Sequence, residues 1–137
     1  MKKISEVMTS EVQIVRPDDT LQDAAAMMAE QDVGALPVCD GSRLQGMITD
    51  RDIAVRAVAN GRDADTPVRE VMSEDVIWCS EDDGTQDVLE RMGQRQIRRI
   101  PVVDANRNLV GIVSLGDLAI EDEENVDEAL RSISMPA

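Results

Sequence analysis

The sequence predicts an α/β (α+β) fold made of two copies of one small domain, each with the element order β-α-β-β-α. Two observations predict it: the chain repeats itself once over about fifty residues, and both copies show the same succession of apolar and helical patterns. The composition, 42% hydrophobic and 31% charged over 137 residues, is typical of a globular protein. A copy of roughly 65 residues buries little surface alone, so we expect the two to pack together.

Three matched pairs of segments carry the repeat. They are 4–9 with 68–73, 36–40 with 100–104, and 46–52 with 111–117. One extra residue, Asn108, lies between the last two segments of the second copy. We therefore divide the chain into a first domain, 1–64, a second domain, 65–122, and a tail or short helix, 123–137. In this tail Val126, Leu130 and Ile133 fall on one helical face.

Each copy predicts the same elements in the same order. The first strand is expected at 12–15 and 76–79, the first helix at 21–31 and 85–94, the hairpin strands at 35–39 and 44–49 and at 99–103 and 109–114, and the last helix from 50 and from 115. Thr20 with Asp23 predicts a capping box on the first helix. Gly61 is expected to end the last helix of the first copy.

The strongest candidates for binding a ligand lie where the second hairpin strand meets the last helix. Both copies carry the pattern Gly-x-x-[Thr/Ser]-x-x-Asp there, ending at Asp52 and Asp117. A helix N-terminus offers free N–H groups to a phosphate, and a carboxylate can accept the hydroxyls of a ribose. The same spacing also forms a capping box that stabilises a helix start by ~1 kcal/mol without a ligand. Spacing alone favours the cap and leaves the ligand site open.

Charge argues against nucleic acid as a partner. The formal net charge is −14, so few basic groups are available to neutralise the phosphates of a nucleic acid. Trp78 is the sole aromatic residue, so the chain has no series of aromatic rings on which bases could stack. An anionic ligand would need a local basic cluster. Arg95, Arg98 and Arg99 form one such cluster, which is either an anion site or a set of surface partners for carboxylates.

Several classes of protein are disfavoured by residue content. The chain has no histidine, and Cys39 and Cys79 lack metal-ligand spacing, so we expect reduced packing cysteines and no metal site. An enzyme would have to depend on carboxylates alone, so no catalysis is expected. Without an apolar span or a signal-like start, we expect a cytoplasmic protein that does not contact a membrane.

Together these residues resemble a pair of CBS domains, named for cystathionine β-synthase and often called a Bateman module. The resemblance rests on the Met-x-x-x-Val entry, the Ala35 to Val38 strand and the Gly-x-x-[Thr/Ser]-x-x-Asp exit, and covers residues 4 to about 120. It is similar to the stand-alone bacterial members of the family. It implies two domains packed through their sheets about a pseudo-twofold axis, with two clefts between them.

The resemblance also implies a regulatory role: binding AMP, ADP, ATP or S-adenosylmethionine in those clefts, with no other cofactor. Asp52 and Asp117 would hold ribose hydroxyls, and Thr49 and Ser114 would contact ribose or phosphate. The clefts would differ in phosphate handling. The remaining implied ligand-binding residues, some acting through backbone groups, are Val12, Ile14, Val33, Gly34, Ala35, Leu36, Pro37, Arg51, Ile77, Trp78, Ile97, Arg98, Arg99, Ile100 and Pro101.

Partners follow from the same pattern. An adenosine nucleotide and an unknown effector protein are expected, and a homodimer would form through small apolar helix faces, unless those faces are core. The faces are Ala24, Ala25, Met27 and Met28 with Ile53, Ala54, Ala57 and Val58. The alternative function is a dimerising interaction module whose nucleotide clefts are unused.

Overall fold

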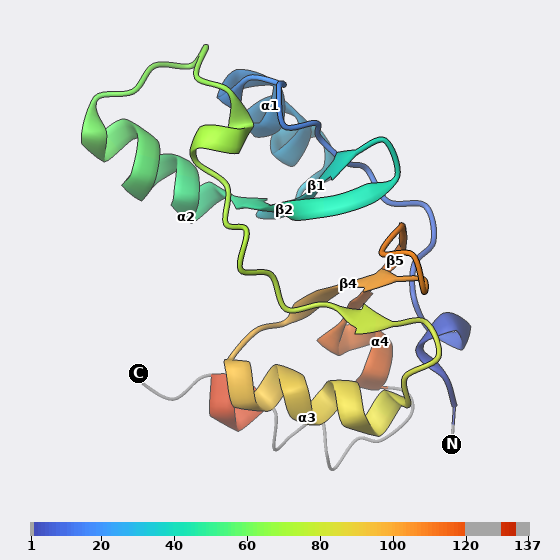
Figure 1. The fold of residues 1–137 in the computed structure, drawn as a ribbon. Coiled ribbons are helices and arrows are strands. Elements are labelled where there is room, and N and C mark those ends of the chain that lie inside the picture. The colour runs from blue at the N-terminus through green and yellow to red at the C-terminus, as the bar shows by residue number, and fades with distance from the viewer. Residues whose placement is uncertain (1, 120–129, 134–137) are drawn as a thin grey trace. The chain divides into compact units, whose positions relative to one another are not determined.

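The computed structural model describes residues 2–119 and 130–133, which fall into two compact units (Figure 1). The continuous unit is Gln13–Val76. The split unit combines the N-terminal residues up to Val12 with the chain from Ile77 onward. These units are not the two sequence copies, because the head of each copy, 4–12 or 68–76, belongs to the unit built mainly from the other copy. The division at 64/65 therefore describes the sequence repeat alone.

The continuous unit contains a helix, a hairpin and a run of helical turns. Its elements are α1 (Leu21–Gln31), β1 (Ala35–Asp40), β2 (Arg43–Thr49), α2 (Asp50–Asp52), the π-helical η2 (Ile53–Ala57), and the 3₁₀ turns η3 (Val58–Asn60) and η4 (Val68–Glu70). β1 and β2 pair antiparallel. Val15 bridges Val38 of β1 in parallel, and Ser73 bridges Met47 of β2, so both edges of the hairpin are extended.

The split unit repeats this plan. Its elements are η1 (Ile4–Glu6), β3 (Cys79–Ser80), α3 (Thr85–Arg95), β4 (Arg99–Val103), β5 (Leu109–Ser114) and α4 (Leu115–Ala119). The strand order is β3-β4-β5, with β3 parallel to β4 and β4 antiparallel to β5. Thr9 bridges Ile112 on the outer edge of β5. The predicted succession of helix, hairpin and second helix is confirmed in both units.

The first strands are shorter than predicted, so the extent given to 12–15 and 76–79 is wrong. In the continuous unit Val15 donates its N–H to the Pro37 carbonyl and accepts from Cys39, at 3.0 and 2.9 Å. Extending this parallel ladder toward residue 13 requires an N–H on residue 37, which proline lacks. Pro101 stands at the same place beside β3. The two prolines explain why pairing starts only at Val15 and Cys79.

The helix ends follow the predicted caps. Thr20 and Asp23 form a reciprocal capping box on α1, with both hydrogen bonds at 3.1 Å. Gly61 ends the helical stretch that closes with η3, at φ 74°, as predicted for the last helix of the first copy. α1 and α3 end in the left-handed residues Asp32 and Gln96, at φ 55° and 56°. α3 extends to Arg95, one residue beyond the predicted end.

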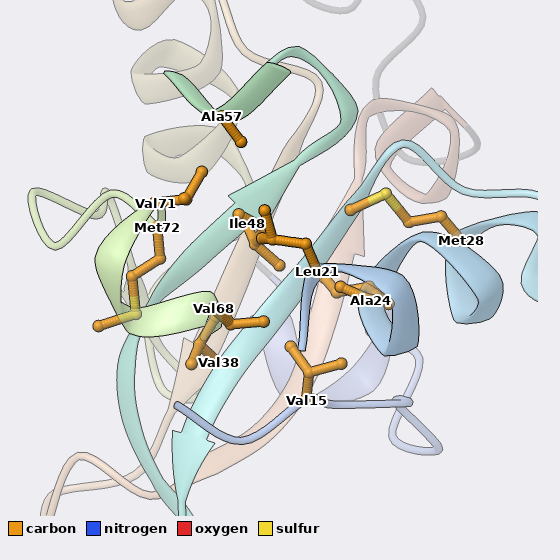
Figure 2. Packing of buried hydrophobic residues seen from close by; sticks show 11 residues of the cluster. Val15, Leu21, Ala24, Met28, Val38, Ile48, Ala57, Val68, Val71 and Met72 are labelled. Atoms are coloured by element: carbon orange, nitrogen blue, oxygen red, sulfur yellow. The ribbon is translucent and has the colours of Figure 1, made fainter. Parts of the chain in front are cut away.

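The core of the continuous unit lies between the hairpin and its helices (Figure 2). Its buried members are Val15, Leu21, Ala24, Met28, Leu36, Val38, Ile48, Ala57, Val68, Val71 and Met72. Three residues assigned to the predicted dimer faces, Ala24, Met28 and Ala57, are part of this core, because α1 and η2 turn those sides toward the sheet. Val58 is 67% exposed, and Val55 beside it is 49% exposed.

The split unit has a core of its own. Its buried members are Ile4, Cys79, Val88, Leu89, Met92, Ile100, Val102, Val113, Leu115 and Leu118. Ile133 packs against it, and Gln96 Nε2 donates to the Ser132 carbonyl at 2.9 Å, while Leu130 is 38% exposed. Of the predicted apolar face of the tail, Ile133 therefore packs on the core, whereas Leu130 is exposed. Val126 lies outside the described residues.

Two glycines let the head of each copy approach the sheet. Met47 and Ser73 exchange two backbone hydrogen bonds at 2.9 and 3.0 Å, and Thr9 and Ile112 do the same at 2.8 and 2.9 Å. A Cβ on Gly46 would lie 2.5 Å from the Ser73 carbonyl oxygen. The glycine that opens each Gly-x-x-[Thr/Ser]-x-x-Asp pattern therefore has a structural role, since no side chain fits beneath the incoming segment.

Candidate ligand sites at the strand-to-helix junctions

The first-copy junction joins the end of β2 to α2. Thr49 Oγ1 accepts the Asp52 N–H at 3.0 Å, and Asp52 Oδ2 accepts the Thr49 N–H at 3.1 Å. The Asp50 N–H donates to the Gly34 carbonyl at 2.9 Å, and Ala35 pairs with Thr49 across the hairpin. The structure thus brings the segments around residues 34 and 50 together, as the resemblance implied.

The second-copy junction has the same construction. Ser114 Oγ accepts the Asp117 N–H at 3.1 Å, and Asp117 Oδ2 accepts the Ser114 N–H at 2.8 Å. The Leu115 N–H donates to the Arg98 carbonyl at 2.8 Å, and Arg99 pairs with Ser114. Both capping boxes are therefore real, and each fixes the hydroxyl and the carboxylate beside a buried strand.

The caps leave acceptor capacity unused. Each carboxylate employs one oxygen in its cap, and no hydrogen bond to the other oxygen of Asp52 or Asp117 is found among residues 2–119 and 130–133. Both side chains are only partly buried. A carboxylate in this position can accept the two donor hydroxyls of a ribose while its helix cap stays intact.

The residues that the resemblance assigned to the ligand pocket differ widely in burial. Leu36 and Ile100 lie in the cores at 2% and 0% exposure, and Pro37 and Pro101 are buried too, so only their backbone groups could meet a ligand. Side chains that are partly buried against a core include Val33 in the continuous unit, and Ile77 and Ile97 in the split unit. Ile14 and Ala35 are half-buried; Gly34 and Arg51 are exposed. Val12 falls in the split unit, apart from the other first-copy residues.

Trp78 has a neighbour that sequence reasoning missed. Its indole is 42% exposed, and the Arg107 guanidinium carbon lies 5.9 Å from the ring centroid. Arg91 Nη1 donates to the Trp78 carbonyl at 3.1 Å. Arg107 has a left-handed backbone, φ 67°, and its buried Nε finds no partner in the described part of the chain. The match of Arg107 to Arg43 in the repeat gave no signal for this contact, because Ile14 stands where the second copy has Trp78.

The cysteines are separate and buried. Cys39 and Cys79 are both free and 1% exposed. Burial raises the pKa of the Cys39 thiol to about 11 and, with a contribution from Asp83, that of Cys79 to about 12. The described residues contain no group of three or more side chains suited to a metal ion. They also contain no helix of the length and apolarity that crossing a bilayer requires.

Both thiols are expected to resist a disulfide reagent such as dithionitrobenzoate at pH 8 and to react fully in denaturant, because the thiolate is the reactive form. The raised pKa values also set a sign for stability. The stability that each buried, neutral thiol contributes is fully present below the thiol pKa of the unfolded chain, 9.0. It is lost as the pH rises toward the folded-state pKa of about 11 for Cys39 or about 12 for Cys79. Denaturant titrations at pH 8 and pH 10 should show lower stability at pH 10. A Cys39→Ser/Cys79→Ser variant corrects for other groups that titrate in this pH range. Rapid labelling of the native protein at pH 8 would contradict the expected protection of the two thiols.

Comparison with known families agrees with this geometry. The model of the CBS domain matches residues 4–58 and again 68–124. The chain is a CBS domain pair. Both copies of the repeat are thereby assigned, and the resemblance drawn from the junction motifs is confirmed.

Three relatives show how close the similarity is. CBS domain-containing protein YhcV of Bacillus subtilis is 47% identical over 136 residues, covering 98% of this chain and 96% of the relative. The crystal structure of Hypoxic Response Protein I with two coordinated zinc ions is 36% identical at TM-score 0.80, covering 88% and 99% of the two chains. The CBS domain pair of protein MJ0100, in complex with 5-methylthioadenosine and S-adenosyl-L-methionine, is 27% identical at TM-score 0.75, covering 88% and 94%.

Membership of this family settles the broad class of function. The pair is a regulatory module rather than an enzyme. The mixed helix and strand fold predicted from the sequence is confirmed by these structures. The zinc ions belong to Hypoxic Response Protein I, and this chain has no histidine with which to bind zinc.

Proposed function

We propose that this CBS pair senses an adenosine ligand, AMP, ADP, ATP or S-adenosylmethionine, at its two strand-to-helix junctions. The observation that carries the proposal is the duplicated junction, in which a capped Thr49 or Ser114 hydroxyl and an Asp52 or Asp117 carboxylate keep acceptor capacity toward solvent. The adenosine ligands bound to the related MJ0100 pair support the choice of ligand class.

Regulation requires that the ligand bind two states of the protein with different affinity. The junction offers a physical basis, because Asp52 and Asp117 hold the start of a helix by the same carboxylate that would meet the ribose. We propose that binding is transmitted from these helices to an effector protein in the cytoplasm. A homodimer is the proposed assembly. Of the predicted faces Ala25, Ala54 and Val58 are exposed, and Val55, which was not assigned to them, adds a further exposed apolar side chain.

Thermal unfolding with adenosine ligands tests the proposal. A ligand at a hundred times its dissociation constant should add about 2.7 kcal/mol to the free energy of unfolding, which is a rise of several degrees in Tm. AMP, ADP, ATP and S-adenosylmethionine would be compared with GMP. Asp52→Ala and Asp117→Ala should each lose the share of the shift that belongs to their junction.

The chain offers a matched control for the lost cap. Asp23 makes the same two capping hydrogen bonds with Thr20 as Asp52 makes with Thr49. Asp23→Ala should therefore lower the basal Tm to a similar degree, yet keep the full ligand shift. If no adenosine ligand raises the Tm of the wild type, the sensing proposal fails and the aspartates are caps alone.

The second candidate function is a dimerising interaction module without a ligand. It is favoured by Val55 and Val58, at 49% and 67% exposure on one helical stretch. Sedimentation equilibrium of the wild type and of Val55→Glu/Val58→Glu distinguishes the assembly. A dimer that dissociates in the variant, together with no ligand shift in the wild type, would support this second function.

A further inference from the structure

The two junctions share one backbone design but carry opposite charge. Resting on the proposed function, we infer that the second-copy junction selects anionic, phosphorylated adenosine ligands through Arg98 and Arg99. The first-copy junction selects uncharged or cationic ones, such as adenosine or the sulfonium of S-adenosylmethionine. Each site takes its preference from the two residues at which the first hairpin strand begins, 34–35 or 98–99, and from the first helical residue, Asp50 or Leu115.

In the first copy the facing segments supply acidic groups. Gly34 and Ala35 carry no charge, whereas Asp50 and Asp52 contribute two carboxylates against the single guanidinium of Arg51. The Asp50 carboxylate lies over Gly34, since a Cβ on that glycine would be 3.0 Å from Asp50 Oδ2. A phosphate approaching this segment would meet a carboxylate, and like charges at short range oppose binding.

In the second copy the same places carry two guanidinium groups. Arg98 and Arg99 answer Gly34 and Ala35, and Leu115, which is buried in the core at 8% exposure, answers Asp50. The Arg98 carbonyl is held by the Leu115 N–H, and Arg99 pairs with Ser114, so the backbone of both arginines is fixed at the junction. Among residues 114–119, which the structure describes, the one acidic side chain is that of Asp117.

These arginines are not explained by stability. Both side chains are exposed, and among the described residues neither forms an ion pair, although the chain has 28 acidic residues and 14 basic ones. Arginine binds phosphate oxygens through a planar fork of donors, and such bonds are stronger than neutral ones. Two successive exposed arginines, whose backbone is held at the junction that carries the Ser114 hydroxyl, are suited to binding a phosphate chain.

Binding of adenosine, AMP and ATP at the second junction, measured with the first disabled by Asp52→Ala, tests this inference. Trp78 is the sole tryptophan and lies beside β3 in the split unit, so its fluorescence is the readout, supported by calorimetry. We expect affinity to rise from adenosine to ATP. Arg98→Ala/Arg99→Ala should lower the ATP-to-adenosine affinity ratio by about tenfold at low ionic strength, and added salt should reduce the wild-type ratio.

The converse experiment uses the first junction, with the second disabled by Asp117→Ala and calorimetry as the readout. Here the ATP-to-adenosine affinity ratio should be lower than at the second junction, and S-adenosylmethionine should bind more tightly than ATP. Asp50→Leu places the residue of the second junction in the first, and it should raise this affinity ratio several-fold. As a control, Arg16→Ala/Arg43→Ala removes the same charge from exposed positions elsewhere and should leave the second-junction ratio within about twofold.

The outcomes separate the two proposals. If ligands bind but Arg98→Ala/Arg99→Ala leaves the ratio unchanged, the charge inference is overturned and the sensing function stands. If the Arg16/Arg43 control lowers the ratio equally, net charge rather than the junction is responsible, and the inference is again overturned. If the wild type binds no adenosine ligand by either readout, both proposals fail together.

Discussion

Gly46→Ala is expected to destabilise the protein by about 3 kcal/mol or more. The new methyl group would lie 2.5 Å from the Ser73 carbonyl oxygen and 3.2 Å from Met72 Sδ. Because that carbonyl accepts the Met47 N–H at 3.0 Å, the incoming segment cannot move without losing hydrogen bonds of about 1 kcal/mol each. Overpacking adds about 1 to 3 kcal/mol. Urea unfolding followed by circular dichroism measures the loss.

Gly111→Ala should follow, with a somewhat smaller cost. Its Cβ would lie 2.8 Å from the Thr9 carbonyl oxygen, but its closest contact, 2.6 Å, is Met8 Sδ, which is on a flexible side chain. Gly116→Ala is the control, since its nearest neighbour is at 3.7 Å and alanine favours a helix by about 1 kcal/mol. A neutral Gly46→Ala would show that Ser73 does not approach β2 this closely.

Ile4→Ala is expected to cost about 2 to 5 kcal/mol, although residue 4 stands near the start of the chain. Ile4 is 0% exposed in the core of the split unit, among residues such as Val88 and Leu118. The Ile4 N–H also donates to the Asp83 carbonyl at 2.9 Å, which holds η1 against the second copy. Denaturant unfolding, read by Trp78 fluorescence, measures the loss within the same unit.

Val58→Ala is the control for Ile4→Ala, because it also shortens an aliphatic side chain but at 67% exposure. Measured at a protein concentration at which the proposed dimer is dissociated, it should change stability by less than about 0.5 kcal/mol. Val68→Ala tests the reciprocal packing, since Val68 at the head of the second copy is 0% exposed in the core of the continuous unit. A loss below about 1 kcal/mol for Ile4→Ala would contradict the packing of 4–12 with the second copy.

Local signals predicted the fold well where the interactions themselves are local. The capping boxes at Thr20, Thr49 and Ser114 formed, and α1 occupies the predicted range, because each cap joins residues three apart. The hairpin strands are close to prediction for the same reason. The first strands were overextended, because their pairing depends on a partner strand in which Pro37 or Pro101 removes a donor.

Long-range arrangements were beyond sequence reasoning. The repeat shows that 4–9 and 68–73 are alike, but likeness does not reveal that each packs with the other copy's sheet. The Asp50 carboxylate over Gly34 and the Arg107 guanidinium over Trp78 likewise depend on segments that meet only after folding. The junction residues were predictable as a motif, and the resemblance already implied that the two sites differ in phosphate handling, whereas the position of the Asp50 carboxylate over Gly34 was not predicted.

The reciprocal placement of the two N-terminal segments has a consequence for synthesis on the ribosome. All residues of the continuous unit have been made once Val76 has emerged, so its internal contacts can form from then on. Residues 2–12 are made earlier, but their partner strand contains Ile112, which follows them by roughly 5 to 20 s at 5–20 residues per second. During that interval the apolar side chains of Ile4 and Val7 have no sheet to cover them. Residues 2–12 are thus translated long before the strand that they pack against, and they are a part of the nascent chain where chaperone binding would be most useful.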